Sequence, residues 1–232
     1  MFNKKKYIKI VPSIIAADFS IIKKEIKDVI YSGADWIHLD IMDNHYVPNL
    51  TIGIEIFKSI RKNINIPIDV HVMANPIDSI IDKFIDAGAD IITFHPETSF
   101  NYKDNLFKIK NSGCKSGIAV NINQSLKFLE NINIKYLDLV LIMSVKPGFC
   151  GQKFINKTFL KIQKTKFKIQ NLNEKFSKKI FLEVDGGINL DNIYEISQKG
   201  ADVFVLGSQI FRSLNYSYMI NKLKYKIYNK IN

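Results

Sequence analysis

Short apolar runs alternate along the chain with longer amphipathic segments, and a repeated tripeptide marks the boundaries between them. Gly-Ala-Asp begins at Gly33, Gly88 and Gly200, each time after a helix-like segment and before an apolar run. Glycine suits the left-handed position that ends a helix, and the β-branched residues that follow it suit a buried strand. The tripeptide therefore indicates helix-to-strand junctions.

The spacing of the tripeptide predicts the number of strand and helix units. The intervals are 88 − 33 = 55 and 200 − 88 = 112 residues, or two and four copies of a unit of about 28 residues, which suits a βαβ repeat. The 232 residues hold about eight such units. The predicted strands are Ile8–Ser13, Trp36–Asp40, Ile68–Val72, Ile91–Phe94, Lys115–Val120, Leu137–Met143, Ile180–Val184 and Val203–Leu206. Helices are predicted between them, for example at Phe19–Ser32, Ile77–Ala87 and Asn192–Lys199.

Strict alternation of strands and helices predicts an α/β fold, and eight strands favour a single-domain (β/α)8 TIM barrel. A doubly wound open sheet is the alternative on pattern alone. Barrels of this kind often reach this length as one unit, so residues 1–232 are expected to form a single catalytic domain. Catalytic groups in such barrels lie at the C-terminal ends of the strands, and polar residues should therefore gather there.

The ends of the predicted strands do carry polar side chains and glycines. They are Ser13, His38, Asp40, His71, His95, Ser144, Asp185, Gly207 and Ser208. Helix caps and solvated loop starts would explain Ser13 and Ser144. Two histidines and two aspartates in otherwise apolar strands need another explanation.

His38, Asp40, His71 and Asp185 combine two imidazoles with two carboxylates. This set suits Zn²⁺ and also Fe²⁺, Mn²⁺ or Co²⁺, whereas a single inward histidine would more often be a satisfied core residue. The absence of sulfur from the set favours a catalytic site with room for substrate over a closed structural one.

Asp40 and Asp185 lie on strands that are three steps apart around an eight-membered ring, so they should face each other across the barrel mouth. Two opposed carboxylates can remove a proton from one face of a carbon and return one to the other, which inverts a stereocentre. Aspartate is a weak base, and a divalent cation that polarises the neighbouring carbonyl would supply the missing acidity.

Glycines follow the last three predicted strands, where barrels of this kind bind phosphate. They are Gly148, Gly151, Gly186, Gly187 and Gly207. Each alone would only mark a turn, but together they favour phosphate binding by backbone N–H groups. Met42, Met73 and Met143 are first interpreted as core residues, and secondly as an apolar wall that protects a reactive intermediate.

Composition limits the possible partners. Thirty-three Lys and Arg against 22 Asp and Glu give a net charge of +11, but the lysines are scattered, which favours a phosphorylated metabolite over nucleic acid. Cys114 and Cys150 have no CxxC spacing and are expected to be reduced thiols. The basic start of the chain lacks an apolar leader, and no run approaches a membrane span, so a soluble cytoplasmic enzyme without a membrane partner is expected.

Seven segments of the chain closely resemble the ribulose-phosphate 3-epimerase family. They are PSIIAADF from Pro12, GADWIHLDIMDNHYVPNLTIG from Gly33, PIDVHVM from Pro67, GADIITFHPE from Gly88, MSVKPGFCGQKF from Met143, LEVDGGI from Leu182 and GADVFVLGSQIF from Gly200. The resemblance runs nearly from end to end. It implies a TIM barrel of the ribulose-phosphate-binding type, and an isomerase of the pentose phosphate pathway that interconverts D-ribulose 5-phosphate and D-xylulose 5-phosphate through a metal-stabilised enediolate.

The resemblance also implies roles for individual residues. His38, Asp40, His71 and Asp185 would bind one divalent metal ion, with Zn²⁺ the first choice and Fe²⁺, Mn²⁺ and Co²⁺ open. Asp40 and Asp185 would be the catalytic base and acid, exchanging roles with direction. The implied substrate-binding residues are Ser13, His71, Gly148, Phe149, Cys150, Gly151, Asp185, Gly186, Gly187, Gly207 and Ser208. Members of the family are commonly homo-oligomers, and the same is expected of this chain.

Two residues depart from the family pattern NPGFGGQ, since Lys146 replaces the asparagine and Cys150 the first of the paired glycines. Cys150 would disturb a phosphate contact only if its position needs a positive φ. Lys146 either adds charge near the phosphate or points to solvent. One alternative function is a 3-epimerase of a related ketose phosphate such as allulose 6-phosphate, and another, of a different class, is a non-catalytic basic scaffold that binds nucleic acid.

Overall fold

The computed structural model describes residues 8–229, so residues 1–7 and 230–232 of the predicted domain and the start of the basic N-terminal run lie outside the described residues. Within this part, eight parallel strands pair in the order β1-β8-β7-β6-β5-β4-β3-β2. Ser13 and His38 bridge the ring between β1 and β2, and the Asp35 N–H donates to the carbonyl of Ile10 over 2.9 Å. The strands form a nearly closed barrel, and the open sheet is excluded.

The strands are β1 (Lys9–Pro12), β2 (Ile37–Met42), β3 (Ile68–Met73), β4 (Ile91–Phe94), β5 (Lys115–Val120), β6 (Leu139–Met143), β7 (Phe181–Asp185) and β8 (Val203–Leu206). The predicted bounds of β4, β5 and β8 are confirmed. β2 and β3 run beyond their predicted ends because they pair with each other as far as Met42 and Met73. β6 begins later than predicted, at Leu139, and β7 includes Asp185, which pairs with Met143.

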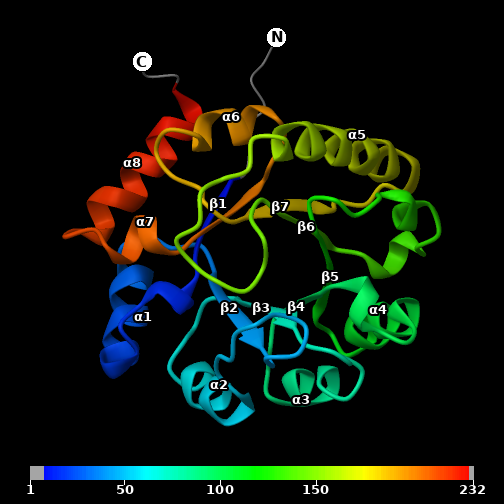
Figure 1. Cartoon of the computed structure of the whole chain (residues 1–232), viewed down its shortest axis with the longest axis horizontal. Coiled ribbons are helices and arrows are strands. Elements are labelled where there is room, and N and C mark those ends of the chain that lie inside the picture. Colours follow the sequence, from blue (N-terminus) through cyan, green and yellow to red (C-terminus); the bar gives the residue numbers. More distant parts are fainter. Residues whose placement is uncertain (1–7, 230–232) are drawn as a thin grey trace.

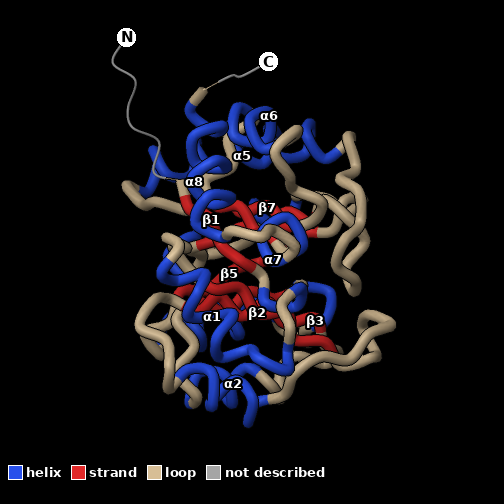
Figure 2. Tube along the Cα trace, turned by 90° about the vertical axis from the view of Figure 1, so that its left-hand side faces the viewer, coloured by secondary structure: helices blue, strands red, loops and turns tan. Residues whose placement is uncertain are grey.

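Helices surround the strands on all sides of the ring (Figure 1), and seen from the side the strands lie between helical layers (Figure 2). The α-helices are α1 (Ile22–Tyr31), α2 (Ile54–Arg61), α3 (Ile81–Asp86), α4 (Tyr102–Asn111), α5 (Thr158–Phe176), α6 (Ile193–Gln198), α7 (Ser208–Phe211) and α8 (Tyr216–Tyr228). The 3₁₀ helices are η1 (Ile14–Ala16), η2 (Phe19–Ile21), η3 (Pro96–Thr98), η4 (Lys127–Glu130) and η5 (Ile134–Tyr136). In the described part, no helix is long and apolar enough to cross a membrane.

Three helix predictions need correction. The segment predicted as Phe19–Ser32 begins with η2 because the Asp18 side chain accepts from the Ser20 N–H and favours a tight turn. Turns replace the first part of the helix predicted at Ile77–Ala87. The connection from β5 to β6 contains η4 and η5 instead of an α-helix. There the Lys161 ammonium donates hydrogen bonds to the carbonyls of residues 121, 122 and 124, so these carbonyls do not accept the hydrogen bonds of an α-helix.

Alternation along the strands separates two apolar regions. Ile37 and Leu39 belong to the large core between strands and helices, whereas Trp36 belongs to the smaller core inside the barrel. His38 and Asp40 share the inward side with Trp36, as the sequence predicts. The barrel interior is therefore apolar at one end and polar where the strands end.

Candidate active site

Strands β2, β3 and β7 bring together His38, Asp40, His71 and Asp185. One nitrogen or oxygen atom of each lies within 4.8 Å of those of the others. His38 Nε2 is 3.4 Å and His71 Nδ1 is 3.3 Å from Oδ1 of Asp40. Both histidines are fully buried. The residues predicted as metal ligands thus form one buried cluster, hereafter the His/Asp cluster.

The two ring nitrogens of His38 have different surroundings. Nδ1 lies 2.8 Å from Oδ2 of Asp69. No hydrogen bond from the described residues reaches Nε2, although this atom is buried. When His38 is neutral, with its one hydrogen on Nδ1 and donated to Asp69, it presents the lone pair of Nε2 to the cluster. A buried nitrogen left open beside carboxylates fits a divalent metal ion, and Asp69 fits the outer partner that orients such a ligand.

The titratable groups of the cluster differ in protonation. Burial opposes the charged form of His38, but the carboxylates of Asp40 and Asp69 outweigh it and raise its pKa well above the ordinary value. For Asp40, His38 and His71 outweigh the effect of burial and hold the pKa well below the ordinary range. Burial, together with the charge of Asp40, raises the pKa of Asp185 to about 6. Asp40 is therefore ionised, while Asp185 is the more readily protonated carboxyl, a division that acid–base chemistry requires.

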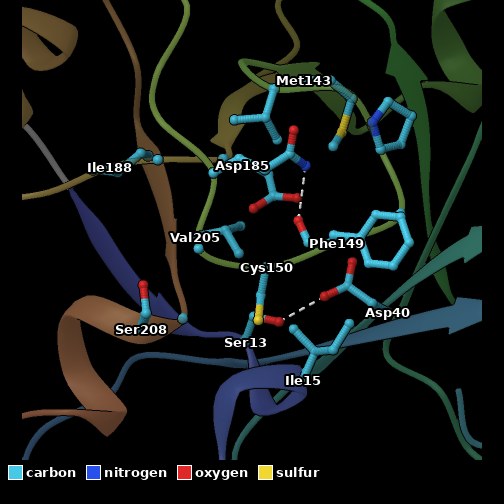
Figure 3. A pocket seen from close by; sticks show the side chains of 18 of the residues that line it. Ser13, Ile15, Asp40, Met143, Phe149, Cys150, Asp185, Ile188, Val205 and Ser208 are labelled. Carbon is cyan, nitrogen blue, oxygen red and sulfur yellow. Dashed lines mark hydrogen bonds between the residues drawn. The ribbon is translucent and has the colours of Figure 1, made fainter. Parts of the chain in front are cut away.

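A pocket opens over the cluster at the C-terminal end of the barrel (Figure 3). Asp40 and Asp185 reach into it from different strands, and the Ser13 hydroxyl donates a hydrogen bond of 2.6 Å to Oδ2 of Asp40. Its lining includes Ser13, Ile15, Asp40, Met42, Met73, Met143, Val145, Pro147, Gly148, Phe149, Cys150, Gly151, Gln152, Asp185, Gly186, Gly187, Ile188, Val205, Gly207 and Ser208. All the predicted substrate-binding residues except His71, which lies beneath in the cluster, therefore line one pocket.

The three methionines near the strand ends are core residues, which confirms the first interpretation, whereas protection of a reactive intermediate stays a prediction. Met42, Met73 and Met143 are buried and belong to apolar clusters of the core. All three also line the pocket. They form an apolar wall next to the carboxylates.

The glycines allow the loops after β6, β7 and β8 to approach one another. Gly148, Gly151, Gly186 and Gly187 have positive φ. A β-carbon on Gly187 would collide with the backbone of Phe154 and Gln152. These positions therefore favour glycine, and all four line the pocket over the cluster.

The two departures from the family pattern are accommodated. Cys150 is exposed and is not among the described residues with positive φ, so its backbone accepts a β-carbon without strain. Lys146 is exposed and lines a neighbouring cleft with Tyr46 and Asn121. It is not among the residues that line the pocket over the cluster, which favours the interpretation that it points to solvent.

Three buried polar residues near the cluster have no role predicted from the sequence. Asp69 precedes His71 by two residues and Glu183 precedes Asp185 by two, so strand alternation could have identified both as inward-facing. Burial and the charge of Asp69 raise the pKa of Glu183 well above its ordinary value. The third, His95, stands out in the sequence only as a polar strand end. Its pKa is lowered to about 4, chiefly by burial.

The fold and the pocket define the class of protein: a (β/α)8 barrel with a metal-binding type of His/Asp cluster facing glycine-rich loops. The sequence model of the Ribulose-phosphate 3 epimerase family matches residues 9–211. The chain belongs to the ribulose-phosphate 3-epimerase family.

Curated relatives agree with this assignment. The chain is 49% identical over 218 residues to ribulose-phosphate 3-epimerase of Buchnera aphidicola subsp. Schizaphis graminum, covering 94% of this chain and 93% of the relative. It is 45% identical over 221 residues to the protein of the same name from Escherichia coli K12, covering 95% and 96%.

Solved structures share the fold at low sequence identity. 3-Hexulose-6-phosphate synthase from Salmonella typhimurium matches with a TM-score of 0.67 and 17% identity, covering 95% of this chain and 99% of that one. Thiamine phosphate pyrophosphorylase from Pyrococcus furiosus matches with a TM-score of 0.62 and 18% identity, covering 96% of both chains. These likenesses support the barrel architecture.

Proposed function

We propose that this chain is an isomerase of the pentose phosphate pathway that reversibly epimerises C3 of D-ribulose 5-phosphate, giving D-xylulose 5-phosphate. The observation that carries the proposal is the pair Asp40 and Asp185, which lie in one pocket within reach of a common carbon and differ in protonation. Family membership supplies the substrate class.

Each carboxylate has a defined task. In one direction, the ionised Asp40 takes the C3 proton from one face, and Asp185 returns a proton to the opposite face. In the reverse direction they exchange roles. The Ser13 hydroxyl donates to Asp40 and holds the carboxylate in place. The apolar wall of methionines limits access of water to the substrate carbon.

His38, Asp40, His71 and Asp185 are the proposed ligands of one divalent metal ion, with Zn²⁺ the first choice and Fe²⁺, Mn²⁺ and Co²⁺ open. When bound, the ion would polarise the C2 carbonyl and stabilise the negative charge of the enediolate. Three loops are proposed to hold the phosphate end of the substrate. They carry Gly148, Phe149, Cys150 and Gly151 after β6, Gly186 and Gly187 after β7, and Gly207 and Ser208 after β8.

Three further proposals follow from the family and the sequence. Residues 1–232 act as one catalytic domain, the protein works in the cytoplasm, and it forms a homo-oligomer. No nucleic acid or membrane partner is proposed.

Turnover of two substrates by matched variants tests the proposal. Wild type, Asp40→Asn, Asp185→Asn and the control Asp86→Asn would each be assayed on ribulose 5-phosphate and allulose 6-phosphate. Asp86 is exposed at the end of α3, at the opposite end of the barrel. Wild type and the control should convert the pentose with the higher kcat/KM, and each active-site variant should lose about 10²- to 10⁴-fold in kcat.

Other outcomes would favour the alternatives. Faster turnover of the hexose phosphate would make the chain a 3-epimerase of that sugar. Salt-sensitive oligonucleotide binding without turnover of either sugar would support the basic scaffold.

A further inference from the structure

His95 is a fully buried histidine for which the proposed reaction has no use. It follows β4 and lies behind His71, with its Nε2 atom 3.0 Å from Nε2 of His71 and the ring centroids 5.2 Å apart. Two neutral imidazoles at this distance share one hydrogen, so one Nε2 must donate and the other must accept. The pair can be arranged in two ways.

The two arrangements differ in what His71 presents to the His/Asp cluster. If His71 Nε2–H donates to His95, then Nδ1 of His71 carries a lone pair directed to the cluster. Oδ1 of Asp40, 3.3 Å from this Nδ1, by itself favours a hydrogen there, so this arrangement needs support from the His95 side of the ring. If His95 Nε2–H donates instead, then Nδ1 of His71 carries the hydrogen. A nitrogen that carries a hydrogen cannot bind a metal ion. The tautomer of His71 therefore decides whether the cluster has four usable ligands.

Glu97 provides this support from the far side of His95. Its Oε1 atom lies 3.7 Å from Nδ1 of His95, a buried nitrogen that no hydrogen bond reaches within the described residues. The carboxylate attracts an N–H and repels a lone pair, so it favours the hydrogen on Nδ1 of His95. Nε2 of His95 is then the acceptor, and His71 Nε2–H the donor.

Glu97 is itself fixed by groups from three other positions. Its Oε1 accepts from the Tyr46 hydroxyl over 2.8 Å and from Nδ2 of Asn121 over 2.9 Å. Its Oε2 accepts from Nε2 of Gln124 over 2.9 Å. The Tyr46 ring also packs against His95, with centroids 4.9 Å apart. A carboxylate held by three donors from distant segments can present a constant charge to His95.

We propose that His95 is a positioning residue which, together with Glu97, fixes His71 in the tautomer whose Nδ1 lone pair faces the His/Asp cluster. The inference rests on the proposed function, since it concerns the proposed metal site. His95 touches neither substrate nor metal in this role. Outer partners of metal-binding histidines typically contribute 10- to 100-fold to metal affinity.

The test is metal binding, measured without reference to turnover. Metal-free wild type, His95→Phe, His95→Gln, Glu97→Gln and the control His45→Gln would be titrated with Co²⁺ and Zn²⁺. Phenylalanine keeps a ring but offers no acceptor, whereas the amide oxygen of glutamine can accept from His71 Nε2–H. His45 lies outside the cluster, and its side chain is 78% exposed.

We expect His95→Phe to weaken Co²⁺ and Zn²⁺ binding about 10- to 100-fold and to shift the visible absorption of bound Co²⁺. His95→Gln should recover part of the affinity, and His45→Gln should bind as wild type does. The metal affinity of Glu97→Gln should lie between those of wild type and His95→Phe. Its side chain has no negative charge, and its amide N–H group would face the donors that now bind the Glu97 carboxylate.

Three results would overturn the inference: wild-type affinity in His95→Phe, equal losses in His95→Phe and His95→Gln, or wild-type affinity in Glu97→Gln. If His95→Phe does not fold, as judged by the circular dichroism of the metal-free protein, Glu97→Gln decides alone. Wild type that binds neither ion would instead overturn the proposed metal site, so the two failures are distinguishable.

Discussion

In His38, each of the two ring nitrogens has one task. Nδ1 is hydrogen-bonded to the carboxylate of Asp69, so Nε2 faces Asp40 and the rest of the cluster. Asp40 in turn accepts from Ser13 through Oδ2 and faces both histidines through Oδ1. Because both carboxylate oxygens of Asp40 have polar partners, this side chain keeps one orientation and its pKa stays low, which suits its proposed role as the base.

Metal binding by the metal-free protein should release protons. The raised pKa of His38 favours its protonated form, and the pKa of Asp185, raised from the ordinary 3.8 to about 6, favours its protonated form at lower pH. Both must lose a proton to bind a cation, so metal affinity should fall as the pH decreases through about 6. Calorimetry in buffers of different ionisation enthalpy measures this release. An affinity that is constant across this range, without proton release, would contradict these protonation states of His38 and Asp185.

Among single residues, sequence reasoning found those that end strands and missed those that depend on geometry. His38 and Asp185 could be identified because polar residues in apolar strands are informative by themselves. Asp69 could have been found from the same alternation. The contact between His95 and Glu97 could not have been found, because it depends on ring orientations and on the position of Tyr46 in another loop.

The loop between β2 and α2 joins the strand that carries Asp40 to the proposed phosphate loop. The Thr51 hydroxyl donates to the carbonyl of Asp40 over 2.6 Å, and Nδ2 of Asn49 donates to the carbonyl of Gly148 over 2.7 Å. Gly148 also lies against Val47, whose Cβ would be 3.3 Å from an added β-carbon. The loop thus connects Asp40, the proposed base, to the proposed phosphate site.

Asn49→Ala should loosen this connection. Loss of one neutral hydrogen bond costs about 0.5–1.5 kcal/mol, which corresponds to a rise of about 2- to 10-fold in KM for ribulose 5-phosphate, with a smaller change in kcat. Steady-state kinetics measure this, with Asn63→Ala as the control, because the Asn63 side chain donates to the carbonyl of Ser59, in the last turns of α2 and away from the pocket. A fall in kcat at constant KM would show that Asn49 acts on the chemistry instead.

Elements were predicted best where their boundaries depend on local sequence. β4, β5 and β8 have the predicted ends because apolar runs are bounded by turn residues there. The prediction of a helix between β5 and β6 was wrong because the conformation of this connection depends on Lys161, a residue of α5. A contact between positions about 40 residues apart leaves no local pattern in the sequence.

Across the whole molecule, the His/Asp cluster joins strands from different parts of the ring. Its residues come from β2, β3 and β7. In the described part, β1 and β2 are joined by the bridge between Ser13 and His38 and by the Asp35 N–H hydrogen bond to the carbonyl of Ile10, and not by a continuous ladder. A bound cation would therefore connect strands on both sides of the least paired position in the barrel.

Metal binding should accordingly raise the melting temperature. A cation at 100 times its Kd stabilises the folded state by about 2.7 kcal/mol, and chelation should remove this gain. Asp185→Asn should show a smaller shift than wild type or Asp86→Asn in thermal melts followed by circular dichroism. Identical melting temperatures with cation and with chelator would contradict the metal site.

The architecture itself was predictable because the Gly-Ala-Asp repeat sets both the unit length and the unit number. Closure was expected only from the count of strands, and the bridge between Ser13 and His38 depends on tertiary packing. The alternation of strands and helices follows from the periodicity of the whole chain, whereas closure of the barrel between β1 and β2 depends on single contacts.

Solvent deuterium incorporation at C3 is the sharpest test of the proposed mechanism, in which two opposed carboxylates exchange protons on either face of the substrate carbon. In heavy water, wild type should convert ribulose 5-phosphate and label C3 in the product. Asp40→Asn and Asp185→Asn should each label only the epimer whose C3 hydrogen faces the remaining carboxylate, without converting it. Exchange that survives complete metal removal, or conversion by Asp185→Asn at the wild-type rate, would contradict the mechanism.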